Sequence, residues 1–303
     1  MVFVRKRKIG KSAYYYLVKS IRVGRDKWKK IERYIGKKYP TLEQIKGFRA
    51  SLPTTKERLE LTGKELEILK EIRERFQTRF KEFSEAQKEK YLKQVSIKYT
   101  YNSNAIEGST LTLRDTALIL KDRMTPKGKE LKEIKEAENH EKCINKTLAY
   151  KKDLNLKFIF ELHKILMSGI DDENAGIIRK IEVSIEGSAF KPPAPSLLRD
   201  MLKDFIAWYK RNKKMHQLLL AALVHLKFVT IHPFADGNGR ISRLLMNFVL
   251  HKDGYPMLNI RYANKEDYYD ALEDCQVSGI EKPFVDYIKQ EYFREHEKKR
   301  SLY

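Results

Sequence analysis

The chain has 303 residues, and its 62 Lys and Arg residues outnumber 41 Asp and Glu, which gives a formal net charge of +21. This length is enough for one large hydrophobic core with an appendage, and no apolar run approaches the ~20 residues that a membrane span needs. Two cysteines without metal-ligand spacing, and an N-terminus without a signal-peptide core, predict a protein of the reducing cytoplasm that has no structural disulfide and no membrane contact.

The N-terminal segment is strongly basic and rich in aromatic residues. Residues 1–50 contain sixteen Lys or Arg and three acidic residues. Three short strands with two turns are predicted there, with strands at Val2–Ile9, Tyr14–Val23 and Trp28–Ile35 and turns at Gly10-Lys11 and Gly24-Arg25-Asp26. The interleaved aromatic residues are Tyr14, Tyr15, Tyr16, Trp28 and Tyr34. Such a sheet suits the phosphates and bases of nucleic acid, and a lysine-rich sheet that docks on a protein has the same composition.

Tyr39-Pro40 marks the predicted end of this sheet. The pattern from there to about Asn102 is helical, and we divide the chain into a basic β module at residues 1–40, a helical segment at 41–104 and a main domain at 105–303. The predicted fold class is mainly α, with the small sheet as an appendage.

Two charged helices are predicted in the helical segment, starting at Leu61-Thr-Gly-Lys-Glu and at Ser84-Glu-Ala-Gln. Apolar residues recur there at spacings of three and four, which predicts a stripe that packs on the core or on a second copy of the chain. The stripe consists of Leu66, Leu69, Ile72, Phe76, Phe80 and Phe83. Packing on the core is favoured over a homodimer contact.

Residues 181–193 interrupt the helical pattern of the main domain. Apolar residues alternate over Ile181–Ile185, and Gly187-Ser188 supplies a turn, so a β-hairpin is predicted. An ordinary surface hairpin fits these residues as well as a functional one.

The most informative segment is the run HPFADGNGR at residues 232–240. Gly237 and Gly239 lack Cβ, so the backbone between them can adopt left-handed conformations and turn its N–H groups into an anion-binding nest, at the start of an apolar helix. Asp236 is a hard oxygen ligand of the kind that holds Mg²⁺ together with substrate phosphates. His232 is the one side chain of the run that could take a proton near neutral pH. A calcium loop would need further acids at alternate positions, and an apolar helix follows instead.

Together with Arg243, this run resembles the signature of the Fic family, His-Pro-Phe-x-Asp-Gly-Asn-Gly-Arg-x-x-Arg, at every specified position. Fic proteins mostly transfer AMP from ATP to a Tyr, Ser or Thr hydroxyl of a target protein. The resemblance implies that His232 deprotonates this hydroxyl and that Asp236 binds Mg²⁺ between the α- and β-phosphates. It assigns phosphate contacts to Gly237, Asn238, Gly239, Arg240 (β-phosphate) and Arg243 (γ-phosphate).

Segments on both sides of the run extend the resemblance. The predicted hairpin is similar to the family's flap, which lies over the site and binds the target backbone by strand addition. This likeness implies target-docking contacts at Val183, Ser184, Ile185 and Glu186. Residues Asp267–Leu272 resemble the segment that contacts adenine, which implies adenine contacts from Tyr268, Tyr269 and Gln276, although many relatives carry Asn at the last position. Helix packing is the alternative for the tyrosines, and His225 is interpreted as a packed helix residue.

Residues Ser103-Asn-Ala-Ile-Glu-Gly108 resemble the family's inhibitory motif, Ser/Thr-x-x-x-Glu-Gly/Asn, on a helix before the catalytic core. The resemblance implies that Glu107 forms a planar two-bond pair with Arg243 and occupies the donors that the γ-phosphate needs. Without the signature downstream, these residues would describe only a helix that ends at Gly108.

The sequence therefore predicts an autoinhibited protein adenylyltransferase that uses ATP and Mg²⁺ and modifies an unidentified target protein, and also itself. Two alternatives stay open. One is removal of AMP from a modified target, with Glu107 positioning water. The other is a regulator that binds nucleic acid through residues 1–40 and senses nucleotide at the Fic-like site.

Overall fold

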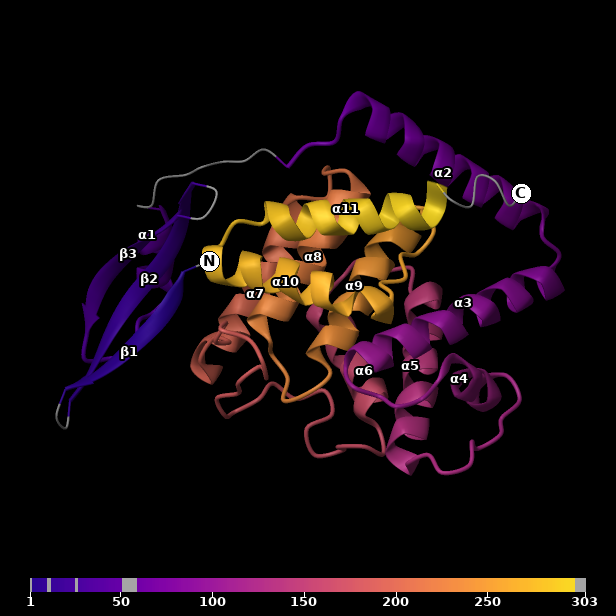
Figure 1. Cartoon of the computed structure of the whole chain (residues 1–303), viewed down its shortest axis with the longest axis horizontal. Helices are drawn as coiled ribbons and strands as arrows, with labels where there is room; N and C mark the ends of the chain where they lie inside the picture. Colours follow the sequence, from indigo (N-terminus) through magenta and orange to yellow (C-terminus); the bar gives the residue numbers. More distant parts are fainter. Residues whose placement is uncertain (1, 10–11, 25–26, 51–58, 298–303) are drawn as a thin grey trace.

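The structure is a computed structural model that describes residues 2–9, 12–24, 27–50 and 59–297. The predicted turn at Gly10-Lys11 and the turn residues Arg25 and Asp26 lie outside the described residues. A bundle of helices forms the main body, and a three-stranded antiparallel sheet stands beside it (Figure 1). The mainly α fold class with a small N-terminal sheet is confirmed.

The elements follow one another along the chain as three strands and then helices. The strands are β1 (Phe3–Ile9), β2 (Ser12–Gly24) and β3 (Lys27–Gly36), in the spatial order β1-β2-β3. The helices are α1 (Leu42–Ala50), α2 (Gly63–Glu82), α3 (Glu85–Ile106), α4 (Leu113–Leu120), α5 (Leu131–Ala149), α6 (Leu156–Met167), α7 (Pro195–Arg211), α8 (Gln217–Ile231), α9 (Asn238–Lys252), α10 (Lys265–Ser278) and α11 (Lys282–Glu297).

The three predicted strands are confirmed within one or two residues at each end, but the packed unit does not stop at residue 40. Helix α1 packs on the sheet, where Phe48 and Leu17 are buried together. The Arg33 guanidinium lies 5.3 Å from the centre of the Phe48 ring. The β segment ends before Pro40, and the apolar face of the next helix covers the sheet, so α1 and the sheet pack as one unit.

Helices α2 and α3 begin where the sequence predicts. Thr62 and Ser84 cap them, and in both cases the side chain three residues later bonds back to the cap, which satisfies N–H groups that the helix leaves open. The apolar stripe of α2 is divided between two uses. Leu69 and Ile72 enter the main core, whereas the three phenylalanines form an aromatic cluster with Tyr91 of α3.

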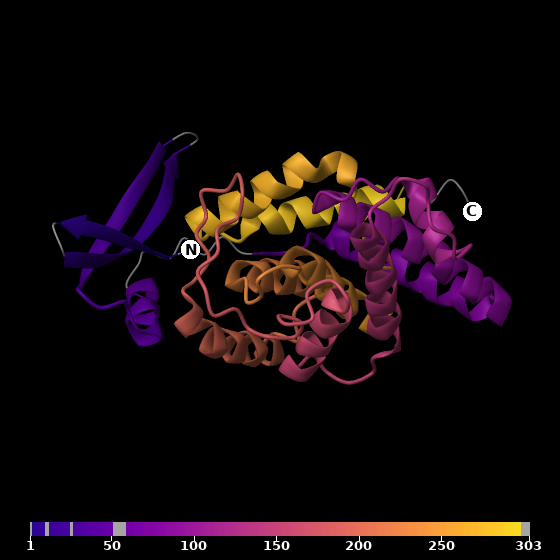
Figure 2. The ribbon, with the colours of Figure 1, turned by 90° about the horizontal axis from the view of Figure 1, so that it is seen from below.

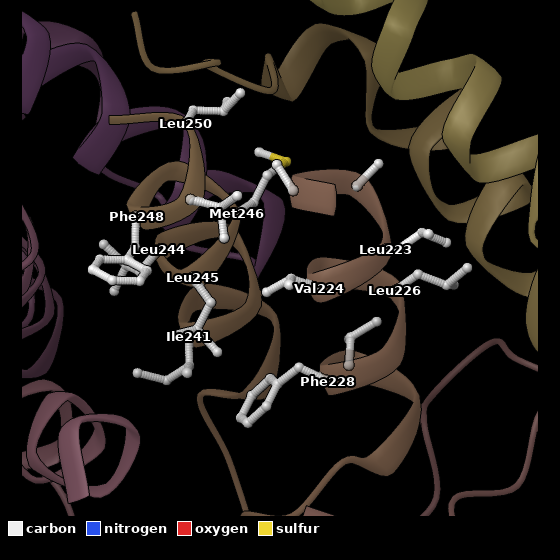
Figure 3. Packing of buried hydrophobic residues seen from close by; sticks show 14 of the residues in the cluster. Leu223, Val224, Leu226, Phe228, Ile241, Leu244, Leu245, Met246, Phe248 and Leu250 are labelled. Carbon is white, nitrogen blue, oxygen red and sulfur yellow. The ribbon is translucent and has the colours of Figure 1, made fainter. Parts of the chain in front are cut away.

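Helices α8 and α9 form the centre of the core. Side chains from the two helices face each other across their interface, as Val224 and Phe228 do toward Ile241 and Leu245 in Figure 3. Helix α8 is buried around its whole circumference, which explains why its sequence is apolar on every face. This rigid pair holds the segment between them, residues 232–237. Among the described residues, none of the helices has the length and apolar content of a membrane span.

Residues 180–194 lie between the sheet and the helices in Figure 2, where they form the salmon loop. The turn is present, with Gly187 at a φ of +73°, but neither arm is a β-strand. The predicted hairpin is therefore wrong in its strands. The arms are held from outside, because Glu273 of α10 accepts hydrogen bonds from the Ala189 N–H and the Ser188 hydroxyl.

Candidate active site

The loop between α8 and α9 turns sharply at both ends. His232 caps α8 with a φ of 51°, a left-handed conformation that is rare outside glycine. Gly237 has a φ of +77° and begins α9. At the start of α9, the buried Asn238 amide accepts a hydrogen bond from the Phe234 N–H at 3.0 Å and donates one to the Phe234 carbonyl at 2.8 Å. The Asn238 side chain therefore fixes the loop, and the phosphate contact predicted for Asn238 is left to its backbone N–H.

A second histidine, which the sequence analysis missed, supports this loop from α6. The His163 ring stacks on the Phe234 ring with 3.6 Å between centroids. Its Nε2–H donates to the carbonyl of Asp236 at 3.0 Å, and its Nδ1 accepts from the Gly176 N–H at 2.8 Å. Burial lowers the pKa of His163 to about 4, so the ring stays neutral and makes both bonds at neutral pH.

His232 has the protonation state that a general base needs. Burial lowers its pKa to about 4; the hydrogen bond with the Val229 carbonyl raises the pKa and the charge of Arg179 lowers it further. The Nδ1–H donates to that carbonyl at 3.3 Å, which leaves Nε2 as the acceptor. The imidazole is therefore neutral at pH 7, with its free lone pair on Nε2.

Arg179 connects the flap segment, residues 180–194, to the catalytic loop. Its Nε donates to the carbonyl of His232 at 2.8 Å, and its backbone N–H donates to the carbonyl of Pro233 at 3.0 Å. The other two guanidinium nitrogens donate to Ile181 and Pro193, at the two ends of the flap, at 2.8 and 2.6 Å. One buried arginine thus holds both His232 and the flap, a role that the sequence did not reveal.

Asp236 and Arg240 form an ion pair at the start of α9. Arg240 Nη2 lies 3.0 Å from Asp236 Oδ2, and Arg240 Nη1 lies 3.1 Å from Glu136 Oε1 on α5. Burial raises the pKa of Asp236, but Arg240 and the Gly237 N–H lower it more, so the carboxyl is ionised at neutral pH. The carboxylate stays about half exposed, with a side-chain exposure of 52%.

Arg243 binds the predicted inhibitory segment. Its Nη2 lies 2.7 Å from Glu107 Oε1 and donates to the Ser103 carbonyl at 2.8 Å, while Nε donates to the Ser103 hydroxyl at 3.0 Å. The pair predicted between Glu107 and Arg243 is present, but it uses one carboxylate oxygen and not two. Three further bonds of the guanidinium go to the Ser103 hydroxyl and carbonyl and to Tyr268, whose hydroxyl lies 3.3 Å from Nη1.

The Glu107 carboxylate also lies against the first turn of α9. A Cβ built on Gly239 would overlap its Oε1 atom. Gly239 is helical and has no positive φ, so of the two glycines only Gly237 adopts the left-handed conformation that the sequence allows. The missing side chain of Gly239 instead leaves room for a carboxylate beside the helix N-terminus, where the helix dipole favours negative charge. Gly108 follows with a φ of +100°, which ends the helix at the position that the sequence suggests.

Residues 153–250 match the model of the Fic/DOC family. The chain carries a Fic domain. Over 202 residues it is 38% identical to the protein adenylyltransferase Fic of Aedes aegypti, which covers 65% of this chain and 40% of that protein. The relative of the same name from Drosophila melanogaster is 37% identical over 201 residues, with the same two coverages. The chain therefore spans about 40% of the length of these curated relatives.

Solved structures share the architecture around the Fic domain. Fic-1 from C. elegans matches 79% of this chain and 71% of its own with a TM-score of 0.68 and 27% identity. A Fic-domain-containing signalling protein from Bacteroides thetaiotaomicron matches 77% of this chain and 95% of its own with the same TM-score and identity. Both alignments are much longer than the matched domain, so the surrounding helices belong to the shared fold.

The predicted adenine residues beside the Fic domain do not behave alike. Tyr268 is buried and its hydroxyl lies 3.0 Å from His225 Nε2, so it is the tyrosine that packs between helices, and His225 is a packed residue as predicted. Gln276 is also buried, with its amide 3.4 Å from Thr230 Oγ1. Tyr269 is 43% exposed and donates to the Ile106 carbonyl. Of the three, only Tyr269 offers an accessible aromatic face.

Proposed function

We propose that this protein transfers AMP from ATP to a hydroxyl side chain of a target protein. The observation that carries the proposal is a neutral histidine, His232, beside a helix N-terminus that already accommodates a carboxylate and is flanked by Arg240 and Arg243. Helix N-termini and arginines favour phosphate at this position. The names of the curated relatives support the same activity.

The reaction follows from these groups. The target hydroxyl oxygen attacks the α-phosphorus of ATP, its proton passes to His232 Nε2, and the bond from the α-phosphorus to the bridging oxygen of the β-phosphate breaks to release pyrophosphate. The N–H groups of Gly237, Asn238 and Gly239 and the guanidinium of Arg240 would stabilise the charge on the phosphates. Tyr269 is the residue that we place against adenine.

Asp236 fits a magnesium ion that is shared with the substrate. Among the described residues no group of three or more His, Cys, Asp or Glu could hold a metal ion. A single half-exposed carboxylate suits Mg²⁺, which keeps several waters and takes its other ligands from phosphates. When bound, the ion would neutralise phosphate charge during the transfer.

We further propose that Glu107 inhibits the enzyme. Its carboxylate lies beside the first turn of α9 and bonds Arg243, so the γ-phosphate would meet a negative charge and an occupied guanidinium. ATP would then bind with its α-phosphate out of line for attack.

Cys143 and Cys275 are both unpaired and buried, which supports action in a reducing compartment such as the cytoplasm.

The test of the reaction uses α-labelled and γ-labelled ATP with the Glu107→Gly protein. Label should be transferred to protein from the α-position and not from the γ-position. His232→Ala in the same background should abolish transfer and retain ATP binding, because the phosphate contacts remain. Transfer of γ-label, or full transfer by the His232→Ala variant, would show that this mechanism is wrong.

A further inference from the structure

A groove separates the N-terminal sheet from the flap. It has a volume of about 680 Å³, and its walls are Phe3–Lys6 of β1 on one side and the flap, with Glu182–Ser184 and Ala189–Pro192, on the other. Figure 2 shows these two segments side by side. Gln276 lines the same groove and contacts Thr230, which lies two residues before His232. Gln276 thus connects the groove to the end of α8, the helix that His232 caps.

Both walls present backbone groups without partners. Strand β1 is the outer strand of the sheet, so in the described part of the chain no strand pairs with its outer edge. Four consecutive residues of β1 line the groove, so β1 borders it, and Tyr15 of β2 and Lys30 of β3 line it as well. Within the described residues, no hydrogen bond reaches the backbone of Glu182, Val183 or Ser184. An extended peptide in the groove could pair with either wall by strand addition.

The charges of the groove have one dominant sign. Lys6, Lys30 and Lys191 line it, and none of them forms an ion pair with a described residue. Arg5 also lines it but pairs with Glu32. Glu182 is the acidic residue of the lining. Three unpaired ammonium groups against one carboxylate favour an occupant with negative charge.

Three of the four aromatic rings that line the groove are engaged or buried, and the fourth, Phe3, is partly exposed. Tyr15 meets the Tyr39 ring edge-on at 5.4 Å, and Lys6 lies 5.9 Å from its centroid. Phe190, on the flap side, is buried. Nucleic-acid bases stack on successive open ring faces, so a groove in which Tyr15, Tyr39 and Phe190 are engaged or buried suits a peptide better than a run of bases.

We infer that this groove binds an extended acidic segment of the target protein, between the edge of β1 and the flap. The inference deepens the proposed function and rests on it, because the segment would present its hydroxyl to His232. The sheet then selects targets by charge, from the wall of the groove opposite the flap. The basic N-terminal module thus acts as the specificity element of the enzyme.

Direct binding tests this in the full chain without ATP. The probe is a fluorescent peptide of alternating Glu and Val with one central Tyr, and its control carries Gln in place of each Glu. The acidic peptide should bind at least about tenfold more tightly, and Lys6→Glu with Lys30→Glu should weaken it about tenfold, since two favourable pairs become repulsive. The matched control is Lys81→Glu with Lys90→Glu, exposed on α2 and α3, which should leave binding unchanged.

Several outcomes would overturn the inference. Equal binding of the two peptides, or equal losses in the two double variants, would show that the groove does not select acidic segments. Tighter binding of an oligothymidylate than of the acidic peptide, lost with Lys6→Glu and Lys30→Glu, would assign the sheet to nucleic acid. Lys6→Gln with Lys30→Gln guards against misfolding and should weaken the acidic peptide about threefold.

Transfer measurements separate this inference from the proposed reaction. In the Glu107→Gly background, Lys6→Glu with Lys30→Glu should raise KM for the acidic peptide and leave kcat unchanged, because neither lysine belongs to the groups assigned to the base or to the phosphates. If no label is transferred to any protein while the acidic peptide still binds more tightly, the proposed reaction is wrong and the inference about the groove is supported. If self-modification proceeds and the two peptides bind equally, the inference about the groove is wrong and the proposed reaction is supported.

Discussion

Glu107→Gly should raise AMP transfer by releasing Arg243 and the first turn of α9 together. The carboxylate that it removes lies 2.7 Å from Arg243 Nη2 and at the position that a Gly239 side chain would take. Once it is gone, the γ-phosphate meets a free donor instead of a negative charge. A coupling of ~1–3 kcal/mol between two sites corresponds to about a 5- to 150-fold change, and we expect the rise in rate to fall in that range.

The stability cost of this change is set by the buried partner. Arg243 has a side-chain exposure of 6% and Glu107 of 27%. An exposed pair contributes at most ~1 kcal/mol, whereas breaking a buried pair costs ~3–5 kcal/mol. Arg243 keeps both bonds with Ser103, so we expect the free energy of unfolding to fall by about 1–3 kcal/mol. ATP should restore part of this loss, because its phosphates bind the folded state at Arg243.

The assay follows label from α-labelled ATP into the protein itself, with chemical denaturation of the same samples for stability. Glu107→Gln is the matched control, because it keeps the length of the side chain and removes its charge, and it should give an intermediate rate. Arg243→Ala added to Glu107→Gly should cancel the gain. Unchanged transfer in Glu107→Gly, together with lost release of AMP from a modified target, would show that Glu107 is catalytic and that the inhibition hypothesis is wrong.

Three further measurements probe single parts of the site. In the ATP-free protein, NMR titration of the His232 ring should show it neutral at pH 7 and protonated only near its pKa of about 4, because burial opposes the charge. A midpoint near 6.5 would contradict the assigned environment. Asp236→Ala should lower transfer about a hundredfold at limiting Mg²⁺ and recover partly with excess, and equal rates at both concentrations would remove Asp236 as a ligand. Gly239→Ala should displace Glu107 yet leave transfer low, because the new Cβ would occupy the place expected for a phosphate. Calorimetry with ATP should show weaker binding than in the unchanged protein. Activation like that of Glu107→Gly would contradict the placement of phosphate beside Gly239.

Local signals in the sequence predicted much of the fold. The helix starts at Thr62 and Ser84, the three strands and the loop that begins α9 depend on neighbouring residues, and all of them are present. The contact between Glu107 and Arg243 was also predicted, although 136 residues separate them. It came from the resemblance of two motifs, since spacing alone carries no information over such a distance.

Tertiary contacts account for what the sequence could not predict. His163 lies 73 residues before its partner Asp236, in a helix whose pattern shows only a buried face. Asn238 and Tyr268 have the right chemistry for ligand contacts, but packing turns both side chains into the interior. The strands of the flap failed for a related reason, because Arg179 and Glu273 hold its arms from outside and leave them unpaired with each other.

The hydrogen bonds of Arg179 give a physical reason for placing the base at a strained residue. A left-handed backbone at a non-glycine residue costs ~1–3 kcal/mol, and His232 adopts one with a φ of 51°. Two donors of Arg179 hold the carbonyls of His232 and Pro233, so the turn is fixed by contacts outside the loop. The same guanidinium bonds both ends of the flap. Arg179 therefore sets both the position of the flap, where we expect the target to bind, and the orientation of His232. The reacting atoms then need little further ordering when the target binds.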